Sequence, residues 1–358
     1  MSSYLQQSNN LQDYKTNYVI TFKKRNIYII IKILYCNKMK IDLKDKKILY
    51  ELDRNSRQSN KQIAKKIGMS EQVVGNRIKR LQDLGIIEYF FVKTNPSVLG
   101  YMHIKIYLRL HNITKEKEEE LLKKLNQQKN IFWLSSLRGK YDLVTSIYVK
   151  NIAEFSQKYD EIFERWGDYI LERNVIVLER GLTHTKAYLI PKQKSEVIVY
   201  SVGEEKSLQL DKVNISLLKI LNKEGRKPLI DIAKQLKVSS DTIKYRINNL
   251  KKSGIITGFG VKIDYRKLNH KYHLIFLKLQ NMNLQKYKKL EQLAQINKNI
   301  IIFIKTIGNH DIELEVETTD NDELDELMKT LRDHFVSEIK DYEILEVTRE
   351  HKLNYFPF

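Results

Sequence analysis

Apolar residues recur at helical spacing in two short segments between residues 63 and 87. The first segment places Ile63 and Ile67 on one face. The second carries an apolar stripe formed by Val74, Ile78 and Leu81. Gly68 can adopt the left-handed conformation that ends a helix, and Ser70 can cap the helix that follows. Two short helices joined by a tight turn, the second with a polar outer face, are predicted to form a helix-turn-helix.

The same pattern returns 169 residues later, in residues 232–256. The aligned pairs include Ser70/Ser239, Arg77/Arg246, Ile78/Ile247, Leu81/Leu250 and Gly85/Gly254. One copy alone would be compatible with an ordinary helical hairpin, but the alignment continues without a gap from about residue 41 to residue 180. The chain is therefore predicted to be a tandem duplication of a two-part unit.

The second part of each unit has a different periodicity. In the first repeat, strands are predicted at residues 101–110, 131–137, 141–149 and 169–178, and helices at 114–128 and 152–166. In the second repeat, strands are predicted near 272–280, 300–307, 311–318 and 341–348, and helices near 283–297 and 320–335. This order, β-α-β-β-α-β, is that of the ferredoxin-like fold. The predicted fold class is α+β, with winged-type helix-turn-helix domains alternating with ferredoxin-like domains in two tandem copies.

These elements set the predicted domain boundaries. The segments are an extension of doubtful status at 1–38, helix-turn-helix domains at 39–95 and 210–264, ferredoxin-like domains at 96–180 and 265–358, and a linker at 181–209. Residues 197–202 of the linker can also be read as a strand. The extension has no counterpart in the repeat, which leads to the hypothesis that Met39 is the initiator. Its longest uncharged run, residues 26–31, is too short to span a bilayer, so no membrane partner is predicted.

Positive charge is concentrated outside the ferredoxin-like segments. The formal net charge is +19, of which residues 1–40 carry +6, residues 41–95 carry +5 and residues 210–264 carry +7. Basic helix-turn-helix segments suit a polyanion, because phosphate neutralisation is the sequence-independent part of nucleic-acid binding. The single cysteine, Cys36, favours a reducing compartment, here the cytoplasm. No Cys/His cluster has metal-ligand spacing, and neither a metal nor another cofactor is predicted.

At this point the residues resemble the Lrp/AsnC (feast/famine) family of prokaryotic transcription regulators. The resemblance rests on the opening pattern Ile41-Asp42-x-x-Asp45, on the helix-turn-helix residues above, and on a Gly-x-x-Asp turn in each ferredoxin-like domain. It covers about residues 41–358 and implies a regulator of transcription, not an enzyme, that binds double-stranded DNA. It also implies that the ferredoxin-like domains self-associate, within the chain or between chains. The tandem arrangement departs from the family's common one-unit chain and leaves the stoichiometry open.

The polar face of each second helix supplies the predicted DNA contacts. A helix turns 100° per residue, and its N-terminal part enters the major groove in a helix-turn-helix. The predicted base-reading residues are Gln72, Asn76, Thr242 and Tyr245. Lys79 and Arg80 are better placed for phosphates, whereas Arg77 and Arg246 suit either phosphate contact or internal bracing. The remaining predicted contacts are Ser70, Val73, Ser239, Asp241 and Asn249.

The resemblance further implies that an amino acid or related small effector binds near the Gly-x-x-Asp turns. The residues concerned are Gly139, Asp142, Gly308 and Asp311. A plainer interpretation is also open, in which glycine supplies a positive φ and aspartate bonds the turn backbone.

Two further function classes are open. Siroheme decarboxylases resemble the same family, and such a site should supply His and Arg groups around a carboxylate-rich tetrapyrrole. The nearly neutral ferredoxin-like domains and the first turn, which lacks histidine, disfavour that enzyme, while His310 and Arg138 keep it open. A nucleoid-type architectural protein, the third class, would bind DNA with little sequence preference.

Overall fold

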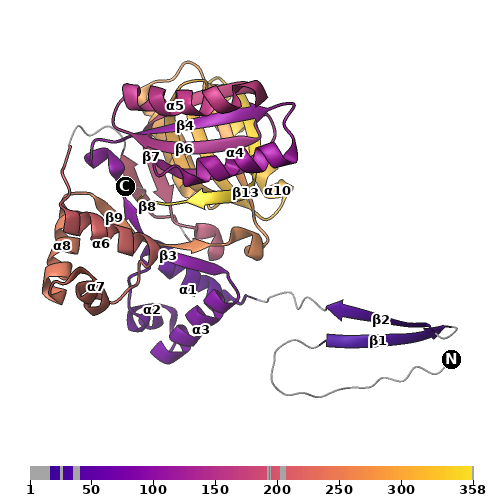
Figure 1. The fold of residues 1–358 in the computed structure, drawn as a ribbon, viewed down its shortest axis with the longest axis vertical. Helices are drawn as coiled ribbons and strands as arrows, with labels where there is room; N and C mark the ends of the chain where they lie inside the picture. Colours follow the sequence, from indigo (N-terminus) through magenta and orange to yellow (C-terminus); the bar gives the residue numbers. More distant parts are fainter. Residues whose placement is uncertain are drawn as a thin grey trace. The chain divides into compact units, whose positions relative to one another are not determined.

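The computed structural model describes residues 17–24, 27–34, 41–191, 193, 195–201 and 207–356. The chain divides into two compact units, residues 1–43 and 44–358. In the first unit, β1 (Asn17–Lys24) and β2 (Ile27–Leu34) pair as an antiparallel hairpin, drawn in indigo in Figure 1. In the part of the chain that is described, no helix has the length and apolar character needed to cross a membrane.

Apart from Leu43, the first residue of α1, the second unit contains both helix-turn-helix domains as the structure has them. The first comprises α1 (Leu43–Arg54), α2 (Asn60–Ile67), α3 (Glu71–Asp83) and β3 (Ile87–Thr94). The second comprises α6 (Lys212–Lys223), α7 (Leu229–Leu236), α8 (Ser240–Lys252) and β9 (Ile256–Ile263). Gly68 ends α2 at φ 68°, and Ser70 and Ser239 cap α3 and α8 through their side chains, all as predicted. The apolar stripes of α3 and α8 are buried.

The strands of the two helix-turn-helix domains pair with each other. β3 and β9 form an antiparallel ribbon in which Phe91 lies opposite Gly260. Two backbone hydrogen bonds repeat the same contact from each side. Ser56 N donates to Phe259 O at 3.0 Å, and Gly225 N donates to Phe90 O at 2.7 Å. Each residue of one bond lies 169 positions from its counterpart in the other, so the ribbon joins the two repeats around an approximate twofold axis.

Both ferredoxin-like domains have the predicted element order. The first comprises β4 (Met102–Leu110), α4 (Lys115–Gln127), β5 (Ile131–Arg138), β6 (Leu143–Val149), α5 (Ile152–Trp166) and β7 (Ile170–His184). The second comprises β10 (Lys271–Leu279), α9 (Leu284–Ile296), β11 (Ile300–Ile307), β12 (Ile312–Thr318), α10 (Asn321–His334) and β13 (Ile339–Leu353). Short 3-10 turns lie at Pro96–Val98, Gly167–Tyr169, Ala187–Leu189 and Tyr265–Leu268.

The two four-stranded sheets join into one closed barrel. Their strand order is β11-β12-β10-β13-β5-β6-β4-β7, and β11 also pairs with β7, which closes the ring. Helices α4 and α5 cover the outer face of the first half over one apolar core (Figure 1). Helices α9 and α10 cover the second half over another. A third cluster, rich in tyrosine and phenylalanine, fills the space between the two sheets.

Two predicted boundaries are wrong because long-range pairing extends the strands. The sequence predicted that β7 ends at residue 178, but the strand continues to His184. Its last residues pair with β11 and with β8 (Val197–Ser201). β13 likewise continues to Leu353 because it pairs with β5. Residues 181–209 are therefore only in part a linker, and the strand reading of residues 197–202 is confirmed for Val197–Ser201.

The two ferredoxin-like domains meet through residues that differ between the repeats. Lys105 on β4 donates to Glu313 at 2.5 Å and to Glu315 at 3.0 Å, both on β12. The aligned positions in the opposite repeats are Leu274, Val144 and Ser146. A pair of identical repeats would bury the lysine or the glutamates without these partners, at a cost of several kcal/mol per ion. The buried ion pairs therefore favour the pairing of unlike domains.

Candidate nucleic-acid interface

The outer faces of α3 and α8 expose most of the predicted DNA-contacting side chains. On α3, the exposed residues are Gln72, Val73, Asn76, Lys79 and Arg80. On α8, they are Asp241, Tyr245 and Asn249, and Tyr245 is 66% exposed. Exposed aromatic and amide side chains on the second helix of a helix-turn-helix can reach base edges. The two faces are unlike, because Gln72 and Asn76 align with Asp241 and Tyr245.

The first turn of each helix is fixed by its cap. The hydroxyl of Ser70 accepts the N–H of Val73 at 3.3 Å, and that of Ser239 accepts the N–H of Thr242 at 3.1 Å. The hydroxyls of Ser239 and Thr242 lie 2.8 Å apart, and Thr242 is half-buried. The structure thus places Ser70, Ser239 and Thr242 in capping contacts at the helix N-termini, where backbone N–H groups also favour a phosphate.

In both helix-turn-helix domains an arginine of the second helix of the motif bonds polar side chains at the start of the domain's first helix. Arg77 Nη1 donates to Asp45 Oδ1 at 2.8 Å, and Arg80 Nη2 bonds Asp45 Oδ2 at 2.5 Å. Asp45 is fully buried, so these two guanidinium groups satisfy a carboxylate that would otherwise be costly. In the second repeat Arg246 Nη1 bonds Asp211 Oδ2 at 2.6 Å and Asn214 Oδ1 at 3.0 Å. Of the two roles predicted for Arg77 and Arg246, the bracing geometry is present in both repeats.

The Gly-x-x-Asp turns lie where the two halves of the barrel meet. A Cβ on Gly139 would lie 2.6 Å from the Leu345 side chain of β13, and one on Gly308 would lie 2.8 Å from Ile176 of β7. Gly139 and Gly308 adopt φ of 134° and 151°. The carboxylates bond backbone at the end of the neighbouring first strand: Asp142 Oδ2 accepts from Leu110 N, and Asp311 Oδ2 from Leu279 N, both at 2.7 Å. These contacts give the four residues a structural role whether or not an effector binds.

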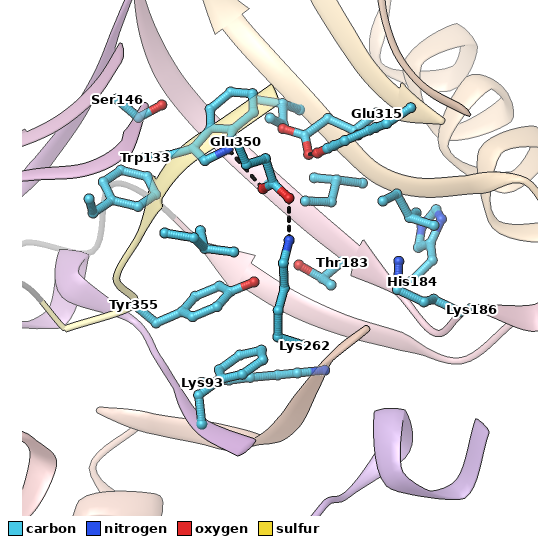
Figure 2. Close-up of a pocket in the computed structure, with 18 of the residues that line it drawn as sticks. Lys93, Trp133, Ser146, Thr183, His184, Lys186, Lys262, Glu315, Glu350 and Tyr355 are labelled. Atoms are coloured by element: carbon cyan, nitrogen blue, oxygen red, sulfur yellow. Dashed lines mark hydrogen bonds and ion pairs between the residues drawn. The ribbon is translucent and has the colours of Figure 1, made fainter. Parts of the chain in front are cut away.

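A cavity lies between the β3–β9 ribbon and the barrel (Figure 2). The space in it that water-sized molecules can occupy is about 200 Å³. The ribbon contributes residues such as Phe91, Lys93 and Lys262, and the barrel contributes Trp133, Glu315 and many others. Lys262 bonds Glu350, and Glu350 also accepts from Trp133 Nε1 at 3.2 Å, so one carboxylate links ribbon and barrel across the cavity.

A row of buried glutamates on β12 was not predicted from the sequence. Residues 312–318 read Ile-Glu-Leu-Glu-Val-Glu-Thr, a pattern typical of a strand with one solvent-exposed face. Glu313, Glu315 and Glu317 are all buried inside the barrel. Burial raises the pKa of Glu315. Burial acts in the same direction on Glu313, but the Lys105 ammonium and His310 outweigh it and lower the pKa of that carboxyl to about 2.

The polar partners of these glutamates come from distant segments. Lys105 and Tyr107 bond Glu313, Tyr272 bonds Glu315, and Lys186 and Tyr188 bond Glu317. The signal that could have found them is a lysine between two isoleucines in a strand, Ile104-Lys105-Ile106. Among the described residues, no group of three or more His, Cys, Asp and Glu side chains is arranged to hold a metal ion.

Both halves of the chain are similar to known proteins. The winged helix-turn-helix DNA-binding family model matches residues 41–88 and 210–257, the two domains that carry α3 and α8. The HTH-type transcriptional regulator Ptr1 of Methanocaldococcus jannaschii is 40% identical over 117 residues, which is 33% of this chain and 78% of that protein. The regulatory protein AsnC of Haemophilus influenzae is 30% identical over 136 residues, 38% of this chain and 89% of that protein.

Similarity to solved structures extends over both repeats. The siroheme decarboxylase NirDL superposes with a TM-score of 0.58 at 15% identity, covering 88% of this chain and 96% of that one. At this identity the likeness concerns the fold, and it extends across the tandem arrangement of helix-turn-helix and ferredoxin-like domains.

Proposed function

The chain belongs to the Lrp/AsnC family of DNA-binding transcription regulators, and on that premise we propose that a single chain reads an asymmetric DNA site. The observation that carries the proposal is the pairing of two unlike helix-turn-helix domains through one ribbon, β3–β9. A one-unit regulator must dimerise, so it presents two identical recognition helices to a palindromic operator. Here one chain supplies both helices, and their outer faces differ.

The two recognition faces favour different bases. Gln72 and Asn76 on α3 can each bond an adenine edge through two atoms, and Asp241 on α8 can accept from the amino group of cytosine. Tyr245 on α8 adds a large exposed ring where α3 has Asn76. The proposed site therefore has unlike halves about one helical turn, or about 10 base pairs, apart.

Substitution of one residue on each helix tests whether these faces read bases. Asn76→Ala and Tyr245→Ala should each weaken binding to the preferred site about ten-fold, because one good base contact contributes about 1–3 kcal/mol. Each variant should relax the base preference in only one half of the DNA site. Lys117→Ala on α4 removes an exposed charge far from either helix in the sequence and is the matched control. Unchanged affinity in both variants would refute the proposal.

An amino-acid effector at the Gly-x-x-Asp turns belongs to the same proposal. Its support is the family and the placement of Gly139 and Gly308 against the opposite half of the barrel. Asp142→Ala and Asp311→Ala should weaken the response of DNA binding to the effector while leaving basal binding in place. If both variants unfold instead, the turns are purely structural.

The decarboxylase alternative has weaker support. A tetrapyrrole that carries several carboxylates needs cations free to pair with it. The four lysines that the described residues place on the wall of the cavity already bond oxygen atoms of the chain. Lys93 bonds the Asp53 carbonyl, and Lys105, Lys186 and Lys262 bond glutamates. Addition of haem to the purified chain decides between the two functions, since a Soret band with saturable binding would favour the enzyme.

A further inference from the structure

The cavity beneath the β3–β9 ribbon contains a buried acceptor that lacks a donor. His184 on β7 is 3% exposed, and its Nδ1 lies 3.1 Å from the carbonyl oxygen of Ile300. A carbonyl only accepts hydrogen bonds, so Nδ1 carries the proton and Nε2 is the lone-pair nitrogen. Burial lowers the pKa of His184, which keeps the ring neutral. Within the described part of the chain, nothing donates to Nε2.

A second unsatisfied group faces the same cavity. Ser146 on β6 is fully buried, and its Oγ has no hydrogen-bond partner among the described residues. Ser146 is paired with Lys105 on one side and with Trp133 on the other. Directly paired residues of antiparallel strands share a face of the sheet, so the hydroxyl lies on the face that carries these two wall residues. Each buried polar group left unsatisfied costs about 1–3 kcal/mol, which a bound ligand could recover.

On the cavity wall lysines and acids are equal in number, and one further carboxylate, that of Glu313, lies behind the wall. Counted over the described residues, the wall carries four lysines and four acids, namely Lys93, Lys105, Lys186, Lys262, Asp53, Glu315, Glu317 and Glu350. Glu313 stands directly behind Lys105 and is fully buried. Burial also lowers the pKa of Lys93, which reduces the positive charge on the wall. Positive charge on a ligand would offset the further carboxylate.

The rest of the wall is rich in aromatic rings. Seven line it: Phe91, Phe132, Trp133, Tyr148, Tyr265, Tyr272 and Tyr355. Ring faces attract cations and pack well against apolar or aromatic groups. Lys105 Nζ already lies 4.8 Å from the centre of the Trp133 ring, which shows that this surface accommodates an ammonium group.

We propose that this cavity is a binding site for a small organic cation with an aromatic or apolar body. An N–H of its ammonium group donates to Nε2 of His184, its body lies against the ring wall, and Ser146 is available to a second polar group. The site is separate from the Gly-x-x-Asp turns and does not depend on DNA contact by α3 or α8. Because the ribbon forms one wall, an occupant touches the element that joins the two helix-turn-helix domains (Figure 2).

Calorimetric titration of the full chain, without DNA, tests the proposal with matched probes. Tryptamine and 2-phenylethylamine should bind saturably, with about one molecule per chain. The neutral 2-phenylethanol and the anionic 3-phenylpropionate should bind at least ten-fold more weakly. The N,N,N-trimethyl derivative of 2-phenylethylamine keeps the charge and the ring but has no N–H, so it should also lose about ten-fold, equivalent to about 1.4 kcal/mol.

Variants locate the site. His184→Phe should weaken amine binding about ten-fold, while His273→Phe, which replaces a buried histidine of β10 outside the cavity, should change it less than two-fold. If His184→Phe does not fold, the trimethyl comparison on the natural chain decides the question alone. Equal binding of the alcohol or the carboxylate, no saturable amine binding at about 10 mM, or equal loss in both histidine variants would overturn the proposal.

Discussion

Phe91 of β3 lies directly opposite Gly260 of β9, and the two residues occupy the same position of the repeat, 169 residues apart. The axis that relates the repeats therefore passes between them. A Cβ on Gly260 would lie 2.8 Å from Cζ of Phe91, so the glycine leaves the space that the ring uses. The ring also stacks on Tyr355, with centroids 3.9 Å apart. Two copies of the first repeat would bring Phe91 against Phe91, and the ribbon thus favours unlike partners.

Removal of Lys105 should destabilise the pairing of the two ferredoxin-like domains. Lys105→Leu copies Leu274, the residue at the aligned position of the second repeat, but it leaves Glu313 and Glu315 buried without their ammonium partner. Breaking a buried pair in this way costs about 3–5 kcal/mol. Urea unfolding followed by circular dichroism measures the loss. A change below about 1 kcal/mol would show that water or other groups compensate the glutamates.

Lys237 should be replaceable by glycine with a gain in stability. It ends α7 at φ 56°, a left-handed conformation that costs a non-glycine residue about 1–2 kcal/mol. Lys237→Gly should therefore raise the free energy of unfolding by about 0.5–1 kcal/mol after the entropy of glycine is counted.

The reciprocal change at the aligned position is the control. Gly68 ends α2 at φ 68°, and an added Cβ would meet no atom within 4 Å. Gly68→Lys should thus lose about 1 kcal/mol through the backbone alone. The same sign of change in both variants would refute the assignment to backbone conformation.

Glu323 should stabilise the second ferredoxin-like domain only above acidic pH. Burial raises the pKa of this carboxyl, but hydrogen bonds from Lys298 and Thr319 outweigh burial and lower the pKa to about 2. A lowered pKa in the folded state gives stability that is complete above the ordinary value near 4.5 and disappears as the pH falls towards 2. Glu323→Gln should therefore cost about 1–2 kcal/mol at pH 7 and almost nothing at pH 2.

The equivalent residue of the first repeat provides the comparison. Glu154 accepts the N–H of Lys150 at 2.7 Å, as Glu323 accepts that of Thr319 at 2.9 Å. Glu323 also bonds Lys298 Nζ at 2.8 Å, so Glu323→Gln should lose more stability than Glu154→Gln. Thermal unfolding at several pH values separates the two, and a loss at Glu323 that is independent of pH would contradict the charge-based explanation.

DNA binding should depend strongly on salt, because the two helix-turn-helix segments carry +5 and +7. If each domain neutralises about three to five phosphates, the slope of log K against log salt should be about −5 to −9. Fluorescence anisotropy with labelled duplex DNA gives this slope. A slope near zero would exclude binding through these faces.

The sequence predicted local elements better than long-range contacts. The helix-turn-helix was predictable because Gly68, Ser70 and the Val74-Ile78-Leu81 stripe carry local signals. Ser70, Ile78 and Leu81 also recur at an offset of 169, where Ile243 takes the place of Val74. The β3–β9 ribbon was not predictable, since each strand finds its partner in the other repeat.

The burial of charged side chains also could not be predicted from the local sequence pattern. The alternation around Glu313, Glu315 and Glu317 indicates a half-exposed strand, and only closure of the barrel shows that both faces are covered. The cavity could not be predicted for the same reason, because its wall combines the ribbon with strands of both ferredoxin-like domains.

Selection of bound sequences from a random duplex pool by the full-length chain tests whether one chain reads an asymmetric DNA site. The unlike faces of α3 and α8, joined in one chain, predict an asymmetric consensus with two different half-sites about one helical turn apart. Replacement of residues 240–246 by the sequence of 71–77 should make that consensus more symmetric. A palindromic consensus from the natural chain would show instead that equivalent helices of two chains read the DNA.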